Sequence, residues 1–352
     1  MARLRRADCS GPGFRRARRG RGFSYLDEDD SPIEEPEVVQ RLRSLGIPPA
    51  WEDVWICPWA NGHIQATGVD VAGRTQYLYH PEWRTRRDAE KFDEMLDFAK
   101  DLPALRRRVA TDLETGDALT RERVLACAVR LLDRGFFRIG TEEYAAVNES
   151  FGLATMRKAH VKLEDDDTMV FDYPAKSGVR QIRAIVDPVA IDVVGMLKRR
   201  RGGSEELLAY KDGRRWRDVR SGDINEYIKE ITGGDYSAKD FRTWNATVLA
   251  AVALAVAGGV AGTKTGRKRA ITRAIKEVAH YLGNTPAVCR ASYIDPRVFD
   301  AYEGGLIIGP AVQKAAEEGG GEMAIHQPQL ERAVVDLIDE RETAPGVEKI
   351  AA

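Results

Sequence analysis

The spacing of hydrophobic and polar positions changes about a quarter of the way along the chain. Up to that change, short runs with β-branched or aromatic residues are separated by turn dipeptides such as Asn61-Gly62 and Ala72-Gly73. This pattern predicts a β meander with strands at 53–57, 63–67 and 76–80. From Glu82 onwards, long charged stretches predict helices at 87–101, 105–114 and 120–135.

The rest of the chain is predicted to be mainly helical, with one β insertion. Strands are expected at 160–164, 169–173 and 179–186, and residues 174–178 form the turn between the last two. A capping box, Ser237-x-x-Asp240, precedes an Ala-rich helix. The apolar run 248–262 is too short to span a membrane, and it predicts a buried helix instead.

Three further helices are predicted towards the C-terminus, the last beginning at Asp295-Pro296. Residues 267–282 form a basic helix with an apolar stripe, which ends at Gly283. Thr285-Pro286 then begins a short helix that carries Tyr293 near its end.

These elements predict an α+β protein. We expect a small antiparallel β domain at residues 1–84 and a mainly helical domain with a β-hairpin insertion at 85–312. Residues 313–352 contain nine acids against four bases and predict an acidic, weakly packed tail.

Charge is unevenly distributed, although the 352-residue chain has a net charge of −1. Residues 1–22 contain eight arginines and one acid, whereas residues 23–40 contain seven acids and no Lys or Arg. The neutral total therefore does not exclude a polyanionic partner such as DNA.

The four cysteines, Cys9, Cys57, Cys127 and Cys289, show neither paired spacing nor neighbouring histidines. Disulfides and zinc are disfavoured, and a reducing cytosol is expected. No apolar segment follows the basic N-terminus, so a secretory signal is not predicted, and its glycines disfavour an amphipathic transit peptide. The chain has neither a phosphate-binding G-x-x-x-x-G-K-[ST] loop nor an acidic cluster for two metals, so we expect no cofactor and no metal.

Candidate chemistry is concentrated in five residues of the helical part. Taken singly, each has an ordinary interpretation: a tyrosine in a core, a solvated lysine at a turn, an arginine paired with a neighbouring acid, an asparagine at a helix end. Together, a tyrosine, two guanidiniums, an ammonium and a neutral donor could attack a phosphodiester and stabilise its transition state. The five residues are Tyr293, Arg138, Arg242, Lys176 and Asn284.

The sequence resembles the type IB DNA topoisomerases, in particular the compact bacterial members related to the poxvirus enzyme. The resemblance covers roughly residues 3–305. In the N-terminal part it is carried by residues 12–25, Ile47-Pro-Pro-Ala-Trp51, Val54-Trp-Ile-Cys-Pro58, Gly62-His-Ile-Gln-Ala-Thr-Gly68 and Gln76-Tyr-Leu-Tyr-His80. In the catalytic part it is carried by Phe137-Arg-Ile-Gly140, Tyr144, Lys176, Lys239-Asp-Phe-Arg242 and the segment from Leu282-Gly-Asn-Thr to Tyr293.

The resemblance implies a role for each candidate. Tyr293 matches the nucleophile that forms a 3′-phosphotyrosyl link, and Arg138 and Arg242 match the arginines that hold the scissile phosphate. Lys176 matches the hairpin lysine that protonates the departing 5′ oxygen. Asn284 stands where the poxvirus and nuclear enzymes have histidine, and it resembles the asparagine of bacterial members. Its amide can donate a hydrogen bond but cannot titrate.

The resemblance further implies double-stranded DNA as the partner, gripped by a monomeric two-domain clamp, and a cytoplasmic enzyme associated with the bacterial nucleoid. DNA contacts are expected from Tyr144 and Lys239, and from the N-terminal arginines Arg15, Arg16, Arg18 and Arg19. The run 3–21 could alternatively be an unordered basic tail, and His63 and His80 are either structural or in contact with DNA.

Two other functions remain open at this point. A tyrosine recombinase, whose fold the catalytic part resembles, uses a similar Arg-Lys-Arg-Tyr set, but it would have a helical N-terminal domain. A non-catalytic DNA-binding protein could preserve the same scaffold.

Overall fold

The chain divides into two compact units, Met1–Lys91 and Phe92–Ala352. The computed structural model describes residues 3–164, 167–258, 263–318 and 328–350. The division falls inside the long helix α2 (Pro81–Glu114), a few residues beyond the change of pattern in the sequence. Helices 87–101 and 105–114 were expected to be separate, but they form this one helix. It continues through Pro103 because Leu102 and Leu105 are both buried in the core.

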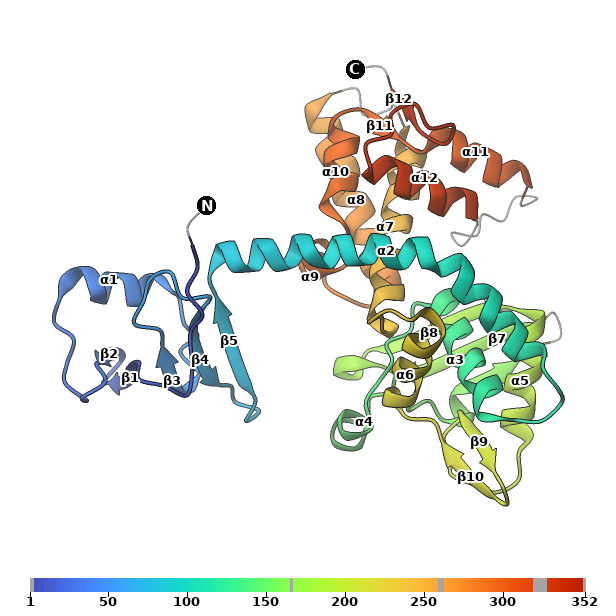
Figure 1. Ribbon diagram of the computed structural model, residues 1–352, viewed down its shortest axis with the longest axis horizontal. Coiled ribbons are helices and arrows are strands. Elements are labelled where there is room, and N and C mark those ends of the chain that lie inside the picture. Colours follow the sequence, from blue (N-terminus) through green and yellow to red (C-terminus); the bar gives the residue numbers. More distant parts are fainter. Residues whose placement is uncertain (1–2, 165–166, 259–262, 319–327, 351–352) are drawn as a thin grey trace. The chain divides into compact units, whose positions relative to one another are not determined.

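The smaller unit contains a five-stranded antiparallel sheet of order β2-β1-β3-β4-β5 (Figure 1). The three strands expected from the alternating pattern are confirmed. The sheet and a short helix enclose a small core that includes Leu42, Val54 and Ile56. The elements are β1 (Phe14–Arg19), β2 (Gly22–Leu26), α1 (Pro36–Ser44), β3 (Glu52–Ile56), β4 (Ile64–Val69) and β5 (Thr75–Tyr79).

The arginine-rich segment is not an unordered tail. Residues 14–19 pair with 22–26 as a hairpin, in which Arg16 lies opposite Tyr25 and Arg18 opposite Phe23. Gly20 lies at the turn with φ +58°, a conformation that few side chains tolerate. Arginines obscured the alternation here, because only Phe14 and Tyr25 mark the inward face.

The larger unit is mainly helical, and an antiparallel sheet lies beside its helices. Helix α7 is its central element: it packs against α3, α6, α8, α10, α11 (Gly309–Glu318) and α12 (Pro328–Ile338) (Figure 1). Ala250 and Leu254 in α7 are buried, as predicted for the apolar run 248–262, whose residues 259–262 lie outside the described residues. The mixed fold, with an N-terminal antiparallel sheet and a helical core, is therefore confirmed. The helices are α3 (Arg121–Gly135), α4 (Glu142–Asn148), α5 (Pro188–Arg199), α6 (Ser221–Thr232), α7 (Ala238–Ala257), α8 (Lys264–Leu282), α9 (Pro286–Ser292) and α10 (Pro296–Glu303).

Two antiparallel β structures interrupt these helices. The sheet β6-β7-β8 (Val161–Leu163, Thr168–Pro174, Arg180–Val186) confirms the predicted insertion, and its β7–β8 turn contains Lys176. The hairpin of β9 (Ala209–Asp212) and β10 (Arg215–Asp218) was not predicted, because its strands are highly charged. The dipeptide Asp212-Gly213 was nevertheless an available hairpin signal.

The expectation of a weakly packed tail at 313–352 is wrong for most of the residues described there. Helix α11 (Gly309–Glu318) packs against α7, and α12 (Pro328–Ile338) buries Leu330, Val334 and Leu337 in the main core. These apolar residues recur at helical spacing, but the acids between them dominate the composition. β11 (Leu306–Ile307), just before α11, pairs antiparallel with β12 (Glu348–Lys349), which comes after α12.

Candidate active site

Arg138 is aimed by the way helix α3 ends. Phe136 takes a left-handed conformation with φ 54°, and Phe137 is buried edge-on against Phe171 at 4.9 Å between ring centroids. Gly135 makes room for this turn, since a Cβ there would lie 2.2 Å from the Phe137 ring. Anchored by its neighbour, Arg138 projects to the end of α8, where its Nη2 donates to the carbonyl of Gly283 at 3.0 Å and also to Oδ1 of Asn284.

Arg242 reaches the same helix end from the first turns of α7. It is 4% exposed. Its Nη2 donates to the carbonyl of Leu282 at 2.9 Å and its Nη1 to the carbonyl of Phe136, while its buried Nε has no partner among the described residues. Burial, and then the charge of Arg138, lower the pKa of Arg242 to about 10, against the opposing effect of Tyr293. This guanidinium therefore occupies a site in which its charge is not neutralised.

Asn284 follows Gly283, which ends α8 in a left-handed conformation with φ 62°. A guanidinium can only donate, so the amide oxygen of Asn284 must face Arg138. The amide nitrogen is then left buried, without a partner among the described residues. Asn284 thus presents an unused hydrogen-bond donor beside Arg138.

Lys176 lies at the tip of the β7–β8 hairpin. The amide of Gly178 donates to the carbonyl of Ala175 at 2.9 Å, and Ser177 has φ 65°, which makes the turn tight. Lys176 itself is exposed. It lines one pocket together with Arg138 and Arg242.

Tyr293 immediately follows α9 and lies beside Arg242, whose guanidinium carbon is 5.4 Å from the centre of its ring. It is not among the residues that line the pocket. The backbone here is fixed by two contacts: the amide of Tyr293 donates to the carbonyl of Cys289 at 3.0 Å, and the amide of Asp295 donates to the hydroxyl of Thr247 in α7 at 3.1 Å. The structure thus brings three predicted cations together in one pocket. Asn284 contacts one of them, Arg138, and Tyr293 lies beside another, Arg242.

A fourth cation, Arg183, lines this pocket and was not predicted. It lies on β8, two residues from Gln181, whose Oε1 accepts from its Nη2 at 2.9 Å. Its Nη2 also donates to the carbonyl of Tyr281, and burial lowers its pKa. Alternation along β8 from the Lys176 turn was the available signal, since it places Gln181 and Arg183 on one face.

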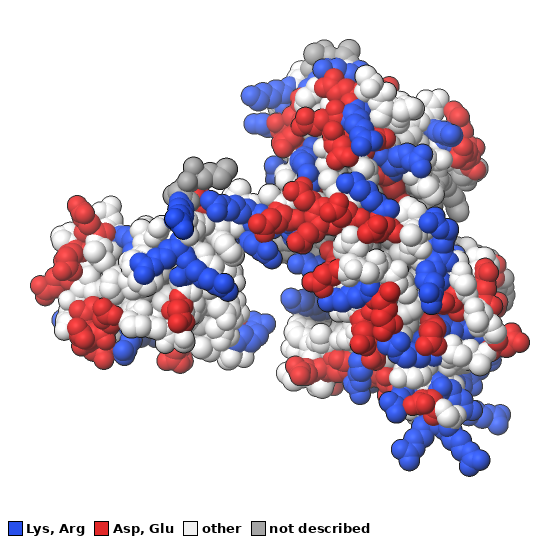
Figure 2. Space-filling model, viewed as in Figure 1, with Lys and Arg blue, Asp and Glu red and all other residues white. Residues whose placement is uncertain are grey.

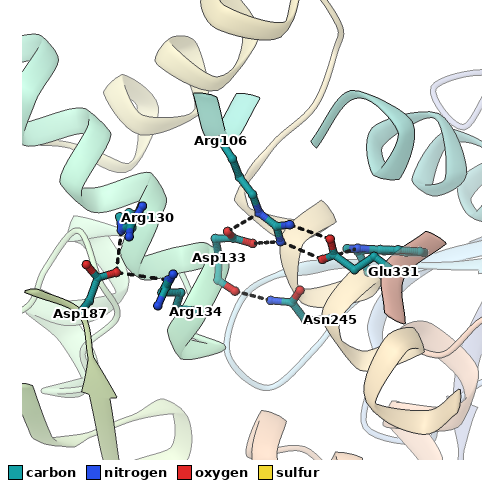
Figure 3. Close-up of polar contacts among 8 residues, drawn as sticks. Arg106, Arg130, Asp133, Arg134, Asp187, Asn245 and Glu331 are labelled. Atoms are coloured by element: carbon teal, nitrogen blue, oxygen red, sulfur yellow. Dashed lines mark hydrogen bonds and ion pairs between the residues drawn. The ribbon is translucent and has the colours of Figure 1, made fainter. Parts of the chain in front are cut away.

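Two groups of arginines and carboxylates, together called the network, lie in the larger unit (Figure 3). Arg106 bridges Asp133 in α3 and Glu331 in α12, with N···O distances of 2.8 and 2.6 Å. Asn245 of α7 donates to the carbonyl of Asp133 at 2.7 Å, and Arg130 and Arg134 both pair with buried Asp187. The network joins α3 and α7, the helices from which Arg138 and Arg242 are presented.

The predicted DNA-binding residues differ in their solvent exposure and in their contacts with other residues. Tyr144 is half-buried on α4, and Lys239 is exposed in the first turn of α7. In the smaller unit Arg18 and Arg19 are exposed, and Arg15 pairs with Asp30 at 3.0 Å.

Arg16, in contrast, is engaged within its own unit. Its Nη1 and Nη2 donate to the carbonyls of Ile47, Pro48 and Trp51, at 2.9, 3.0 and 2.7 Å. The prediction that Arg16 binds DNA therefore receives no support from this geometry.

The two histidines left open have structural contacts in the smaller unit. His63 accepts from the amide of Ala7 at 3.0 Å and packs edge-on against Trp83 at 4.8 Å. His80 accepts from the amide of Glu82 at 3.2 Å. Both act as hydrogen-bond acceptors that fix the local backbone.

Surface charge in the larger unit is segregated (Figure 2). Acidic side chains gather along α2, and basic side chains gather over the β9–β10 hairpin. Among the residues that the structure describes, no three His, Cys, Asp or Glu side chains are grouped to hold a metal ion, and no helix is long and apolar enough to cross a membrane. The four cysteines are free thiols.

Comparison with known families gives two matches along the chain. The family described as "Eukaryotic DNA topoisomerase I, catalytic core" matches residues 80–303. The family described as "Bacterial DNA topoisomerase IB, N-terminal domain" matches residues 22–70.

Similar proteins include DNA topoisomerase 1B of Acanthamoeba polyphaga mimivirus, which is 31% identical over 298 residues, covering 83% of this chain and 88% of that protein. DNA topoisomerase 1 of Schizosaccharomyces pombe is 27% identical over 205 residues, 56% of this chain and 22% of that protein. DNA topoisomerase 1 beta of Arabidopsis thaliana is 22% identical over 162 residues, 46% of this chain and 16% of that protein. Since the catalytic-core family covers more than half of the chain and the viral relative matches 83% of it, the chain belongs to the type IB DNA topoisomerases.

Proposed function

We propose that this topoisomerase relaxes supercoiled duplex DNA by cleaving one strand through Tyr293, allowing rotation and religating the strand, with no requirement for ATP or a metal ion. One observation carries the assignment of the site. Four cations line the pocket and none of the described residues that line it is Asp or Glu; the cations are Arg138, Lys176, Arg183 and Arg242. An uncompensated cluster of this kind is electrostatically complementary to a phosphate.

The cleavage step is a transesterification. The phenolic oxygen of Tyr293 forms a bond to phosphorus, its proton passes to water, and the bond between phosphorus and the 5′ oxygen breaks. Free tyrosine has a pKa near ~10, so nearby guanidinium charge is needed to favour the phenolate. Arg242, next to the Tyr293 ring, supplies such charge. Religation reverses these steps, and a phosphotyrosine conserves the energy of the broken bond.

Lys176 is proposed to give its proton to the departing 5′ oxygen. An alkoxide is a poor leaving group, and a positioned acid typically contributes on the order of 10²–10⁴ in rate. The lysine lies at the tip of a hairpin, exposed towards solvent and lining the cationic pocket. This position suits a residue that must enter a DNA groove.

Arg138, Arg242 and Asn284 are proposed to hold the non-bridging oxygens. Guanidiniums can grip a phosphate with two parallel hydrogen bonds, which an ammonium cannot do. The unpartnered amide nitrogen of Asn284 supports its role as a neutral donor to the same phosphate.

The remaining DNA contacts are proposed to surround this site. Exposed Lys239 and half-buried Tyr144 would contact the backbone near the scissile phosphate, and Arg18 and Arg19 would contact it from the smaller unit. In this proposal residues 1–84 clamp one side of the duplex, residues 85–312 carry out the chemistry, and the protein acts as a monomer on DNA of the bacterial nucleoid. Sedimentation of the free protein and of its DNA complex tests the monomer.

The decisive experiment is relaxation of a supercoiled plasmid in EDTA without ATP. The plasmid carries no paired recombination sites, so relaxation also separates this activity from that of a recombinase. We expect relaxation of both positive and negative supercoils. An absolute requirement for Mg²⁺ or ATP would overturn the proposal.

Tyr293→Phe is the matched control, because it removes one oxygen and keeps the ring beside Arg242. We expect native DNA binding and no covalent protein–DNA adduct after denaturation with detergent. An adduct that persists in this variant would assign the nucleophile to another residue.

A further inference from the structure

Three arginines meet at the C-terminal end of α8. The carbonyls of Tyr281, Leu282 and Gly283, which are consecutive, accept hydrogen bonds from Arg183, Arg242 and Arg138 respectively. The last carbonyls of a helix lack partners within the helix and carry its partial negative charge. This helix end therefore gathers three guanidiniums without using a carboxylate.

Arg183 differs from the other two because it comes from the strand next to the Lys176 turn. Residues 181 and 183 lie on the same face of β8, and both meet the end of α8. Arg183 donates to the carbonyl of Tyr281. The side-chain amide nitrogen of Gln181 lies 3.2 Å from where a Cβ on Gly283 would stand. On the opposite face of the same strand, Ile182 is 58% exposed.

The contacts of Arg183 thus tie one end of the hairpin to the rest of the site. Further along β8, Ile185 is buried and packs near Gly135. Towards the turn, Val179 is 56% exposed, which leaves Gln181 and Arg183 as the inward-facing anchors of that part of the strand.

We infer that Arg183 is a positioning residue of the cleavage reaction. It fastens the Lys176 hairpin to the end of α8 and so fixes the position of Lys176 relative to Asn284. This inference rests on the proposed function of Lys176 as the acid for the leaving oxygen. Displacement of a catalytic group by about 1 Å can reduce a rate by about 10². Nη2 of Arg183 donates to both Gln181 and the carbonyl of Tyr281, and the shorter, tetrahedral ammonium of a lysine does not reproduce the position and planar geometry of that nitrogen.

The test uses two DNA substrates that differ in the leaving atom. In one, the bridging 5′ atom is oxygen; in the other it is sulfur, which leaves without an acid. We expect Arg183→Gln to cleave the oxygen substrate about 10- to 100-fold more slowly than the native enzyme. On the sulfur substrate it should recover to within a few-fold of native, as Lys176→Ala should, and its DNA affinity should stay within about two-fold.

Arg180→Gln is the matched control. It removes an arginine from the same strand, but this one faces outwards, is 69% exposed and pairs with Asp172. It should cleave both substrates at the native rate. Arg183→Lys keeps the charge and tests the geometry alone, and it should also be slow on oxygen and rescued by sulfur.

The outcomes separate the inference from the proposal beneath it. If sulfur fails to rescue Lys176→Ala, the acid role of Lys176 is wrong. If sulfur rescues Lys176→Ala but neither Arg183 variant, or if Arg183→Gln loses DNA affinity in proportion to its rate, the positioning role is wrong. The double variant Lys176→Ala/Arg183→Gln should cleave the oxygen substrate within about three-fold of Lys176→Ala, since both changes remove the same proton transfer. If the rate losses of the two single variants multiply in the double variant, Arg183 does not act through Lys176.

Discussion

The larger unit holds two groups of arginines in opposite ways. In the network of Figure 3, each guanidinium meets carboxylates: Arg106 bonds to both oxygens of Asp133 and of Glu331, at 2.6–2.9 Å. In the pocket, Arg138, Arg183 and Arg242 are held by backbone carbonyls at the end of α8. Both groups are fixed in place, but only the first is neutralised.

The pKa values follow this difference. Burial acts to lower the pKa of Arg106, but the charges and hydrogen bonds of Asp133 and Glu331 outweigh it and raise the pKa. At Arg242, burial and the neighbouring Arg138 lower the pKa to about 10. The comparison indicates how a fold can prepare an anion site: neutral dipoles orient the cations, and no carboxylate neutralises them, as the proposed binding of a phosphate requires.

The largest effect should come from removing Asn284, the neutral donor that contacts Arg138 at the edge of the site. Asn284→Ala should reduce the rate of cleavage by roughly 10²–10³, as removal of one oxyanion donor does, while thermal stability stays near native. Asn284→His should keep substantial activity, because a neutral imidazole also donates. Single-turnover cleavage and thermal unfolding measure the two quantities, and near-native cleavage by Asn284→Ala would remove the residue from the catalytic set.

The same position gives a pH signature. The native profile should show no inflection from this site near ~6.5, because an asparagine does not titrate. Asn284→His should acquire an inflection, with activity falling as pH rises and the imidazolium becomes a neutral, weaker donor.

A carboxylate introduced into the pocket should remove the difference between the pocket arginines, which have no carboxylate partner, and those of the network. Gln181 already accepts from Arg183, so Gln181→Glu places a nearly isosteric anion there and makes the pocket resemble the network. We expect cleavage to slow by about 10², since the added carboxylate repels the phosphate, while thermal stability is unchanged or higher. Gln181→Met is the uncharged control, and an equal loss in both variants would mean that charge is not the cause.

Removing a carboxylate from the network should instead lower stability and leave cleavage nearly unchanged. Glu331→Ala leaves Arg106 with Asp133 alone and removes the acceptor of the Trp244 indole, so unfolding free energy should fall by about 2–3 kcal/mol. Cleavage by the folded protein at low temperature should remain within a few-fold of native. Chemical denaturation measures the first quantity. A catalytic loss without loss of stability would mean that α12 acts on the pocket directly.

The difference between the two groups also explains what the sequence could predict. The alternation at 179–186 and the capping box at Ser237 and Asp240 specify local structure, so the hairpin and the start of α7 were predictable, and motif order identified Arg138 and Arg242. Arg183 and Glu331 were not predicted, because their roles depend on partners 98 and 225 residues away. No local pattern distinguishes an arginine that meets a carbonyl from one that meets a carboxylate.

The C-terminal helix shows the same limit at the level of packing. Acidic composition suggested a loose tail, whereas Leu330 and Val334 are fully buried. Composition averages over both faces of a helix, and only the spacing of its apolar residues reveals the buried one.

The smallest effect is expected in the smaller unit, where the comparison recurs within one strand. Arg18 is exposed, whereas both terminal nitrogens of Arg16 are bound to carbonyls of its own unit. If Arg18 contacts one phosphate, Arg18→Ala should reduce the slope of log affinity against log salt by about 0.9. Arg16→Ala should leave that slope unchanged and instead lower the stability of its unit, because three carbonyls lose their donor. DNA binding measured between low and moderate salt, together with thermal unfolding, distinguishes the two. A reduced slope for Arg16→Ala would show that binding DNA draws this guanidinium away from its carbonyls, and that an arginine held by neutral dipoles remains available to a phosphate outside the catalytic pocket as well.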